Sequence, residues 1–148
     1  MAGKIVAVCV SKEKGTQKTD VGSVEIKAQH GIEGDAHSGP WHRQVSLLSD
    51  ESIEKMRKLG LELGYGDFGE NIVTQGIDLL ALEVGSKLKL GDLVIGEVSQ
   101  IGKVCHDRCA IYYKTGDCIM PREGIFLEIL VGGKVSVGDA IEIIKKGA

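Results

Sequence analysis

The residues best suited to chemistry are concentrated in residues 103–122, which contain three of the four cysteines, Cys105, Cys109 and Cys118. The segment begins Lys-Val-Cys-His-Asp-Arg-Cys, so Cys105 stands among charged side chains rather than in an apolar run. Four basic and two acidic residues give it a charge of +2 within a chain of −3. Neighbouring cations favour the thiolate, which is the reactive nucleophile and the metal-binding form of cysteine. We therefore predict that Cys105 is the functional thiol and that Lys103 and Arg108 make its surroundings positive.

Two other uses of these thiols fit the same residues. The three cysteines and His106 could bind a metal ion, although the paired spacings typical of zinc sites are absent. Cys105 and Cys109 could also form and break a disulfide in redox exchange. Cys9 differs from them, because it lies in an apolar run, residues 5–10, where cysteine behaves as a small buried hydrophobe.

A second candidate segment, residues 30–43, is rich in glycine and contains three of the four histidines. Gly34 and its glycine neighbours would let backbone N–H groups approach an anion closely, with Arg43 as the charged partner. Asp35 and His37 add further polar groups to the same loop. The alternative interpretation is a solvated turn that joins two strands and leaves its imidazoles at the surface.

A third segment reads Gly-Asp-Phe-Gly-Glu-Asn at residues 66–71. It matches neither the dinucleotide-binding glycine fingerprint nor the phosphate-binding loop, which needs Gly-Lys-Ser/Thr. Gly-x-Ser-x-Gly, the motif of the α/β-hydrolases, is also missing from the chain. The segment instead predicts a tight turn that places Glu70 and Asn71 at the start of a strand.

The elements that must position these residues are mostly strands. Alternating apolar residues predict strands over residues 4–10, 23–29, 44–48, 71–74, 86–90, 93–98, 124–131 and 140–144. The chain has 21 glycines, and Gly-Asp recurs five times as a turn signal. Many short strands with few helices predict a mainly β protein folded as a closed or nearly closed barrel.

One helix is clearly predicted, starting after Ser49 as its N-cap. Acidic residues follow at once and basic ones come later, as the helix dipole favours. Ile53, Met56 and Leu59 would form its apolar stripe, and Gly60 would end it. A shorter helix is predicted over residues 107–114.

Composition sets the broad class of the protein. Its 148 residues favour a single domain, residues 1–148, and 43% apolar with 26% charged residues is ordinary for a globular chain. The net charge of −3 argues against a dedicated nucleic-acid binder. No stretch approaches the about 20 apolar residues of a membrane span, and the first apolar run is too short for a signal peptide. We expect a cytoplasmic protein with reduced thiols.

Taken in order, the motifs resemble the MOSC family, the domain found at the C-terminus of molybdenum-cofactor sulfurases and as small stand-alone proteins. The matching pieces are Gly-Ile-Glu-Gly-Asp-Ala-His at residues 31–37, Gln-Val-Ser-Leu-Leu at 44–48, residues 66–71, the strand leading to Cys105, and the hairpin at Gly138-Asp139. The likeness runs from about residue 4 to residue 144, and residues 66–71 are its most specific part.

The resemblance implies a distorted β-barrel of the MOSC type, with one clear helix and short extra helices. It also maps the family's cysteine onto Cys105, either as the acceptor of sulfur in a persulfide or as a ligand of the molybdenum cofactor. Family members usually carry Pro before this cysteine, whereas Val104 precedes it here. With Cys105 as the catalytic group and metal ligand, the predicted cofactor-binding residues are Gly34, Asp35, His37, Arg43, Asn71, Lys103, Cys105 and Arg108.

Nothing in the chain resembles the pyridoxal-phosphate domain of the full sulfurases, so no pyridoxal-phosphate site is expected. Sulfur or cofactor would then come from a partner: a cysteine desulfurase, a molybdoenzyme or a cofactor-assembly protein. The alternatives to a carrier or binding module are a cofactor-dependent reductase, a sulfur transferase, or a thiol-metal protein that shares only the fold.

Overall fold

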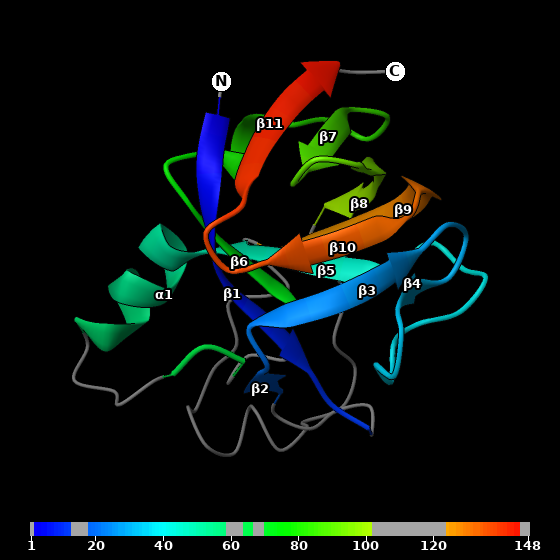
Figure 1. Cartoon of the computed structure of the whole chain (residues 1–148). Coiled ribbons are helices and arrows are strands. Elements are labelled where there is room, and N and C mark those ends of the chain that lie inside the picture. The colour runs from blue at the N-terminus through cyan, green and yellow to red at the C-terminus, as the bar shows by residue number, and fades with distance from the viewer. Residues whose placement is uncertain (1, 13–17, 59–63, 67–69, 102–123, 146–148) are drawn as a thin grey trace.

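A computed structural model describes residues 2–12, 18–58, 64–66, 70–101 and 124–145, and a closed barrel of seven strands dominates it (Figure 1). The strands are β1 (Ala2–Val10), β5 (Val45–Ser49), β6 (Ile72–Gln75), β7 (Lys87–Leu90), β8 (Val94–Ile101), β9 (Ile125–Val131) and β11 (Ala140–Lys145). They follow one another in the order β11-β7-β8-β9-β5-β6-β1, and pairing of β1 with β11 closes the ring. Closure removes most of the exposed strand edges of an open sheet. The mainly β barrel predicted from the sequence is confirmed.

Within this barrel only β5 and β6 are parallel neighbours. Parallel neighbours need a crossover connection, which in this chain contains helix α1 (Asp50–Arg57). The Ser49 side chain caps α1 by accepting a hydrogen bond from the Ser52 backbone N–H at 3.1 Å, as the sequence predicts. The predicted stop at Gly60 and the short helix over residues 107–114 lie outside the described residues.

The remaining strands are short. β2 (Thr19–Asp20) pairs with the end of β1, and β3 (Ser23–Lys27) lies between β10 (Gly133–Ser136) and β4 (Gly31–Ile32) in a separate small sheet. Figure 1 shows β3 and β10 side by side across the barrel. All eight strands predicted from alternation are present, and β10 is the short strand before the predicted hairpin at Gly138-Asp139, whereas β2 and β4 were not predicted. A 3-10 turn, η1 (Leu79–Ala81), follows β6.

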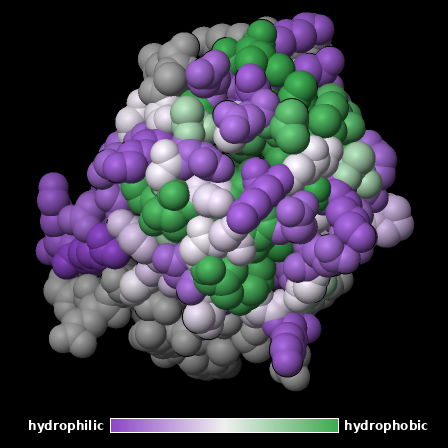
Figure 2. Space-filling view, viewed as in Figure 1, coloured by the Kyte–Doolittle hydropathy of each residue, from purple (hydrophilic) through white to green (hydrophobic). Residues whose placement is uncertain are grey.

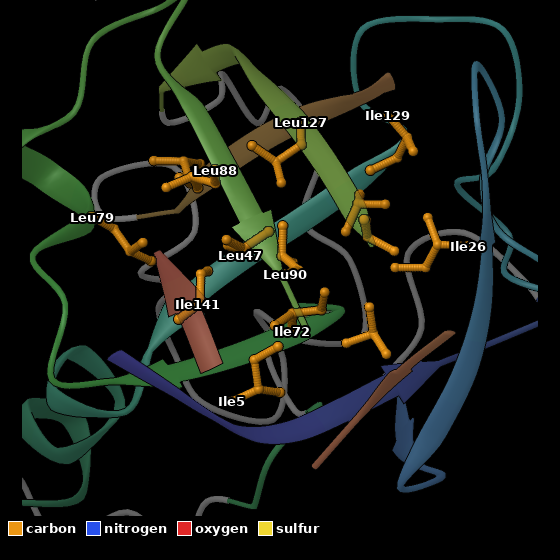
Figure 3. Close-up of a cluster of buried hydrophobic side chains, with 14 of the residues drawn as sticks. Ile5, Ile26, Leu47, Ile72, Leu79, Leu88, Leu90, Leu127, Ile129 and Ile141 are labelled. Carbon is orange, nitrogen blue, oxygen red and sulfur yellow. The ribbon is translucent and has the colours of Figure 1, made fainter. Parts of the chain in front are cut away.

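Two apolar clusters lie on opposite faces of the barrel wall. Leu47, Ile72 and Leu127 belong to the larger cluster, which fills the barrel (Figure 3). Leu48 and Val73, the next residues along β5 and β6, belong to the second cluster, which also contains Ile53 and Met56 of α1. Because successive side chains of a strand point to opposite faces, one residue packs in the barrel interior and the next packs against α1.

The second cluster also holds Cys9, which is fully buried. This confirms its assignment to the core. On the face seen in Figure 2, hydrophobic and hydrophilic residues are interspersed. None of the described helices is long and apolar enough to cross a membrane.

Two glycines with positive φ give a matched test of backbone strain. Gly34 has φ +85° and open space where a Cβ would lie, whereas Gly66 has φ +90° and its Cβ would clash with the Lys18 carbonyl oxygen. Gly34→Ala should lower the free energy of unfolding by about 1 kcal/mol, the cost of a left-handed alanine. Gly66→Ala should lower it by more than about 2 kcal/mol, because the backbone must also move apart.

Urea denaturation of both variants measures the difference. Equal losses at the two positions would contradict the proposed contact between Gly66 and Lys18. The positive φ predicted for Gly34 is confirmed by the structure, whereas Gly69 lies outside the described residues.

Candidate functional site

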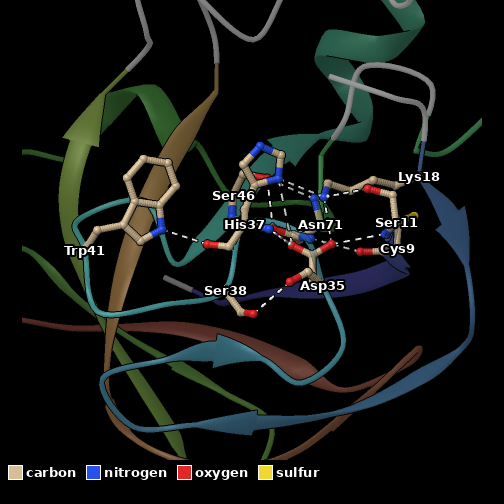
Figure 4. Close-up of polar contacts among 9 residues, drawn as sticks. All are labelled: Cys9, Ser11, Lys18, Asp35, His37, Ser38, Trp41, Ser46 and Asn71. Carbon is tan, nitrogen blue, oxygen red and sulfur yellow. Dashed lines mark hydrogen bonds and ion pairs between the residues drawn. The ribbon is translucent and has the colours of Figure 1, made fainter. Parts of the chain in front are cut away.

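A buried ion pair between Lys18 and Asp35 anchors the loop that follows β4. The ammonium Nζ lies 2.7 Å from Asp35 Oδ1, and both side chains are fully buried. Lys18 precedes β2, while Asp35 belongs to the glycine-rich loop between β4 and β5. The pair therefore joins two segments that are distant in the sequence (Figure 4).

The Asp35 carboxylate also holds the backbone around it. Its Oδ1 accepts a hydrogen bond from the Ser11 N–H and its Oδ2 accepts one from the His37 N–H, each at 3.1 Å. Ser38 Oγ donates to the Asp35 carbonyl oxygen at 2.7 Å. The carboxylate thus ties residue 37 of the loop to the residue after β1, and the Asp35 carbonyl oxygen adds residue 38.

The protonation of this pair follows from its surroundings. Burial alone would raise the pKa of the Asp35 carboxyl, but the hydrogen bond and charge of Lys18, with the two backbone N–H donors, together lower it below its ordinary value. Burial also lowers the pKa of the Lys18 ammonium, and Asp35 offsets part of that effect. Because the pKa of Asp35 is lowered on folding, its contribution to stability is complete above the unfolded pKa and is lost as pH falls through the folded one.

A row of rings continues from this ion pair. The imidazole of His37 stacks on the indole of Trp41, with centroids 6.4 Å apart and planes 6° apart. Trp41 Nε1 donates to the His37 carbonyl oxygen at 2.7 Å, which fixes the two residues to each other. Trp41 in turn lies under the guanidinium of Arg43, whose Cζ is 5.8 Å from the ring centroid.

The Arg43 guanidinium makes three contacts that leave its two terminal nitrogens available. Its Cζ also lies 5.5 Å from the Phe126 ring centroid, and its Nε donates to Gln100 Oε1 at 3.0 Å. No described residue accepts a hydrogen bond from its two terminal nitrogens. A guanidinium in this state is oriented for a planar two-point contact with an anion such as phosphate or carboxylate.

Asn71 has a different setting from the other predicted ligands. It is fully buried, its Oδ1 accepts from the backbone N–H and hydroxyl of Ser46, and its Nδ2 donates to the Cys9 carbonyl oxygen at 3.0 Å. The side chain thus braces β1, β5 and the start of β6. Glu70 beside it is also buried and accepts from the Gly66 N–H at 2.8 Å. The predicted contact of Asn71 with cofactor stays a prediction.

The predicted thiol site lies outside the described residues. Lys103, Cys105 and Arg108 belong to residues 102–123, as do Cys109 and Cys118. That segment joins β8 to β9, whose residues Ile101 and Ile125 are paired. The prediction that it shares one side of the barrel with the glycine-rich loop stays a prediction. Among the described residues, no group of three or more His, Cys, Asp or Glu side chains could hold a metal ion.

Three residues of this site were not predicted from the sequence: Lys18, Trp41 and Gln100. Lys18 gave no local signal, because it lies in a polar stretch with Lys12 and Lys14. Its burial is set by Asp35, which is 17 residues away. Trp41 did carry a signal, as the only tryptophan of the chain and a near neighbour of Arg43.

Comparison with known proteins identifies the family. The model of the MOSC domain matches residues 34–142, well over half of the chain. The chain belongs to the MOSC domain family. No match was found among curated protein sequences. The match begins at Gly34 and so includes the loop of Asp35, His37 and Arg43.

Solved structures of other MOSC-type proteins have the same fold. YuaD from Bacillus subtilis is similar with a TM-score of 0.78 and 19% identity, over 95% of this chain and 94% of that one. YiiM from Geobacillus stearothermophilus is similar with a TM-score of 0.73 and 20% identity, over 97% of this chain and 75% of that one. YiiM from Escherichia coli is similar with a TM-score of 0.71 and 19% identity, over 100% of this chain and 72% of that one. At this level of identity the likeness concerns the fold alone.

The buried ion pair of the MOSC domain can be tested with a matched pair of substitutions. Asp35→Asn should lower the free energy of unfolding at pH 7 by roughly 3–5 kcal/mol, because it leaves the Lys18 ammonium buried without a counter-charge. Glu33→Gln removes an exposed partner of Lys27, 3.0 Å away, and should change it by less than about 0.5 kcal/mol.

Urea denaturation at pH 7 compares the two variants directly. A loss for Asp35→Asn no larger than that for Glu33→Gln would show that the ion pair does not hold the loop.

Proposed function

We propose that this MOSC domain binds the molybdenum cofactor, with Cys105 as the thiolate that ligates molybdenum or carries sulfur as a persulfide. Arg43 would hold the anionic end of the cofactor, and Gly34 and His37 would lie along it. The cofactor is a molybdenum ion held by a pterin dithiolene, and it would supply the metal centre.

The observation that carries the proposal is the state of Arg43. A guanidinium that contacts two rings and is held by Gln100 has lost most of its rotational freedom before any ligand arrives. A pre-oriented group loses little further entropy on binding, so its contacts contribute more fully to affinity. A structural arginine would be expected to have its terminal nitrogens paired, whereas those of Arg43 have no partner among the described residues.

The chemistry of the donor set fits the parts of the cofactor. The Arg43 fork matches a phosphate group, and the exposed backbone at Gly34 has no side chain to block an approaching anion. A cysteine thiolate is a soft ligand suited to a thiophilic metal centre. Cys105 follows Ile101 by four residues, and Arg43 contacts Gln100, the residue before Ile101. Chain connectivity therefore supports a site shared by the anion receptor and the thiol.

The same thiolate accounts for the sulfur-carrier form of the proposal. The Cys105 thiolate would attack the terminal sulfur of a persulfide on a donor protein such as a cysteine desulfurase. A sulfur–sulfur bond forms on Cys105, the one on the donor breaks, and the donor cysteine leaves as a thiolate. The recipient would be a molybdoenzyme or a cofactor-assembly protein, in the reducing cytoplasm that keeps the thiol free.

Cys105 should be the most reactive of the four thiols. Limiting alkylation of the folded protein followed by peptide mass spectrometry should label Cys105 first and the fully buried Cys9 last. Cys105→Ala should abolish bound molybdenum or persulfide sulfur, measured by elemental analysis and by sulfane-sulfur assay. First labelling of Cys109 or Cys118, with sulfur and cofactor retained in Cys105→Ala, would contradict the assignment.

Arg43 should contribute to cofactor affinity in proportion to its lost hydrogen bonds. Removing a charged hydrogen bond of about 1.5–3 kcal/mol predicts that Arg43→Gln weakens binding by roughly 10- to 150-fold. Arg43→Lys should keep only part of the affinity that Arg43→Gln loses, because lysine retains the positive charge but not the paired N–H donors of the guanidinium. Binding is followed by pterin fluorescence and molybdenum content.

Arg57→Gln is the matched control, since that arginine lies on α1 and is already paired with Glu54 and Asp50. It should bind cofactor as the unaltered protein does. Full affinity in Arg43→Gln would remove the anion receptor from the proposal. Zinc or iron without pterin in the purified protein would favour a thiol-metal protein instead.

A further inference from the structure

The buried Lys18 ammonium has three acceptors, which equals its number of protons. They are Asp35 Oδ1 at 2.7 Å, His37 Nδ1 at 3.0 Å and Ser11 Oγ at 3.3 Å (Figure 4). An ammonium group has no lone pair, so each of these contacts must be accepted by the other atom. His37 Nδ1 therefore carries no proton, and the ring proton of the neutral imidazole is on Nε2.

The charges around His37 favour this neutral form. Protonating Nδ1 would place an N–H of an imidazolium 3.0 Å from the nitrogen of an ammonium, a direct like-charge contact. Asp35 Oδ2 lies 3.9 Å from the same Nδ1 and would favour the proton, but that carboxylate is closer to Lys18 and already paired with it. Glu70 acts on the same ammonium through its charge and helps to keep it protonated.

We infer that Lys18 is a positioning residue that holds His37 as a neutral hydrogen-bond donor, with its proton on Nε2, facing the anionic ligand of the site. The inference rests on the proposed function for the ligand, and on the Lys18–His37 contact for the state of the ring. In this arrangement His37 donates to an oxygen of the ligand and does not act as a general acid over the neutral pH range.

Other contacts fix the ring in the orientation that this role needs. Trp41 stacks on the imidazole and bonds to the His37 carbonyl oxygen, while Asp35 accepts from the His37 backbone N–H. The His37 side chain is 24% exposed, so part of it reaches the surface while Nδ1 contacts Lys18. Stability alone is a weak reason for a buried ion pair, because apolar replacements of such pairs are often neutral or stabilising. A fixed tautomer at a surface-reaching histidine gives the pair a function.

The state of His37 can be measured in the ligand-free protein. Nitrogen-15 NMR of the four imidazoles, assigned for His37 with a His37→Gln variant, should show the Nε2–H tautomer and no protonation of His37 from pH 8 down to about pH 5.5. Lys18→Met should let the ring become protonated within this range, because the Asp35 carboxylate then faces Nδ1 without a competing cation. Lys27→Met is the control, because its ion pair with Glu33 is exposed, and it should leave His37 unchanged.

An Nδ1–H tautomer, or ordinary titration of His37 in the unaltered protein, would overturn the inference without any variant being needed. Should Lys18→Met fold poorly, the apolar double replacement Lys18→Met with Asp35→Leu serves the same purpose, since it leaves no unpaired buried charge.

The pH profile of cofactor binding tests the role of the ring in the site. Between pH 7.5 and 5.5 the affinity of the unaltered protein should stay within twofold, whereas that of Lys18→Met should rise several-fold as His37 becomes cationic. If the affinity of the unaltered protein and that of Lys18→Met changed with pH in the same way, the role of His37 as a donor would be overturned. If no cofactor binds while NMR shows the Nε2–H tautomer, the proposed function fails and the assignment of Lys18 stands.

Discussion

The ion pair between Lys18 and Asp35 is the interaction on which the arrangement of the candidate site depends. It joins the chain entering β2, the residue that follows β1, and the glycine-rich loop after β4. If the loop opened, an ammonium buried by the fold would lose its counter-charge, at a cost comparable to a large part of a typical domain's stability. The loop is therefore held as firmly as the barrel to which it is tied, although it contains no long element of its own.

The barrel supplies the second half of the frame. Arg43 contacts Gln100 near the end of β8 and Phe126 at the start of β9, as well as Trp41 of its own loop. The β8 and β9 strands are paired with each other, so the sheet provides two of the three contacts that position the guanidinium. Figure 4 shows Trp41, His37, Asp35 and Lys18 following one another along the same loop and its neighbours.

How much of this could be predicted from sequence depends on how local each signal was. The strands β5 and β9 were predicted because alternation is a property of neighbouring residues, and the Ser49 cap of α1 likewise depends on a contact three residues away. The short strand β4 has two residues and no periodicity to detect.

The burial of Lys18 depends on Asp35 across the fold, so a lysine in a polar stretch was indistinguishable from a solvated one. The same limit applies to Asn71, which was predicted to start a strand near the site. Its placement before β6 is confirmed, but its contacts with Ser46 and Cys9 belong to strands more than 20 residues away. Types and order of residues therefore identified the family, while the geometry of the loop required the structure.

The two cations of the described site, Lys18 and Arg43, differ in whether their hydrogen-bond donors already have acceptors. Lys18 has an acceptor for each of its three protons and no exposed side-chain surface, so an incoming anion could reach it only by displacing one of these acceptors. Arg43 has one of its nitrogens held and the other two without a partner among the described residues, and it is only half-buried. A cation whose donors are all satisfied contributes orientation, and one whose donors are unsatisfied contributes affinity. His37 contacts Lys18 and stacks on Trp41, which in turn contacts Arg43, so in the proposed site it links the buried ion pair to the guanidinium that would bind the anion.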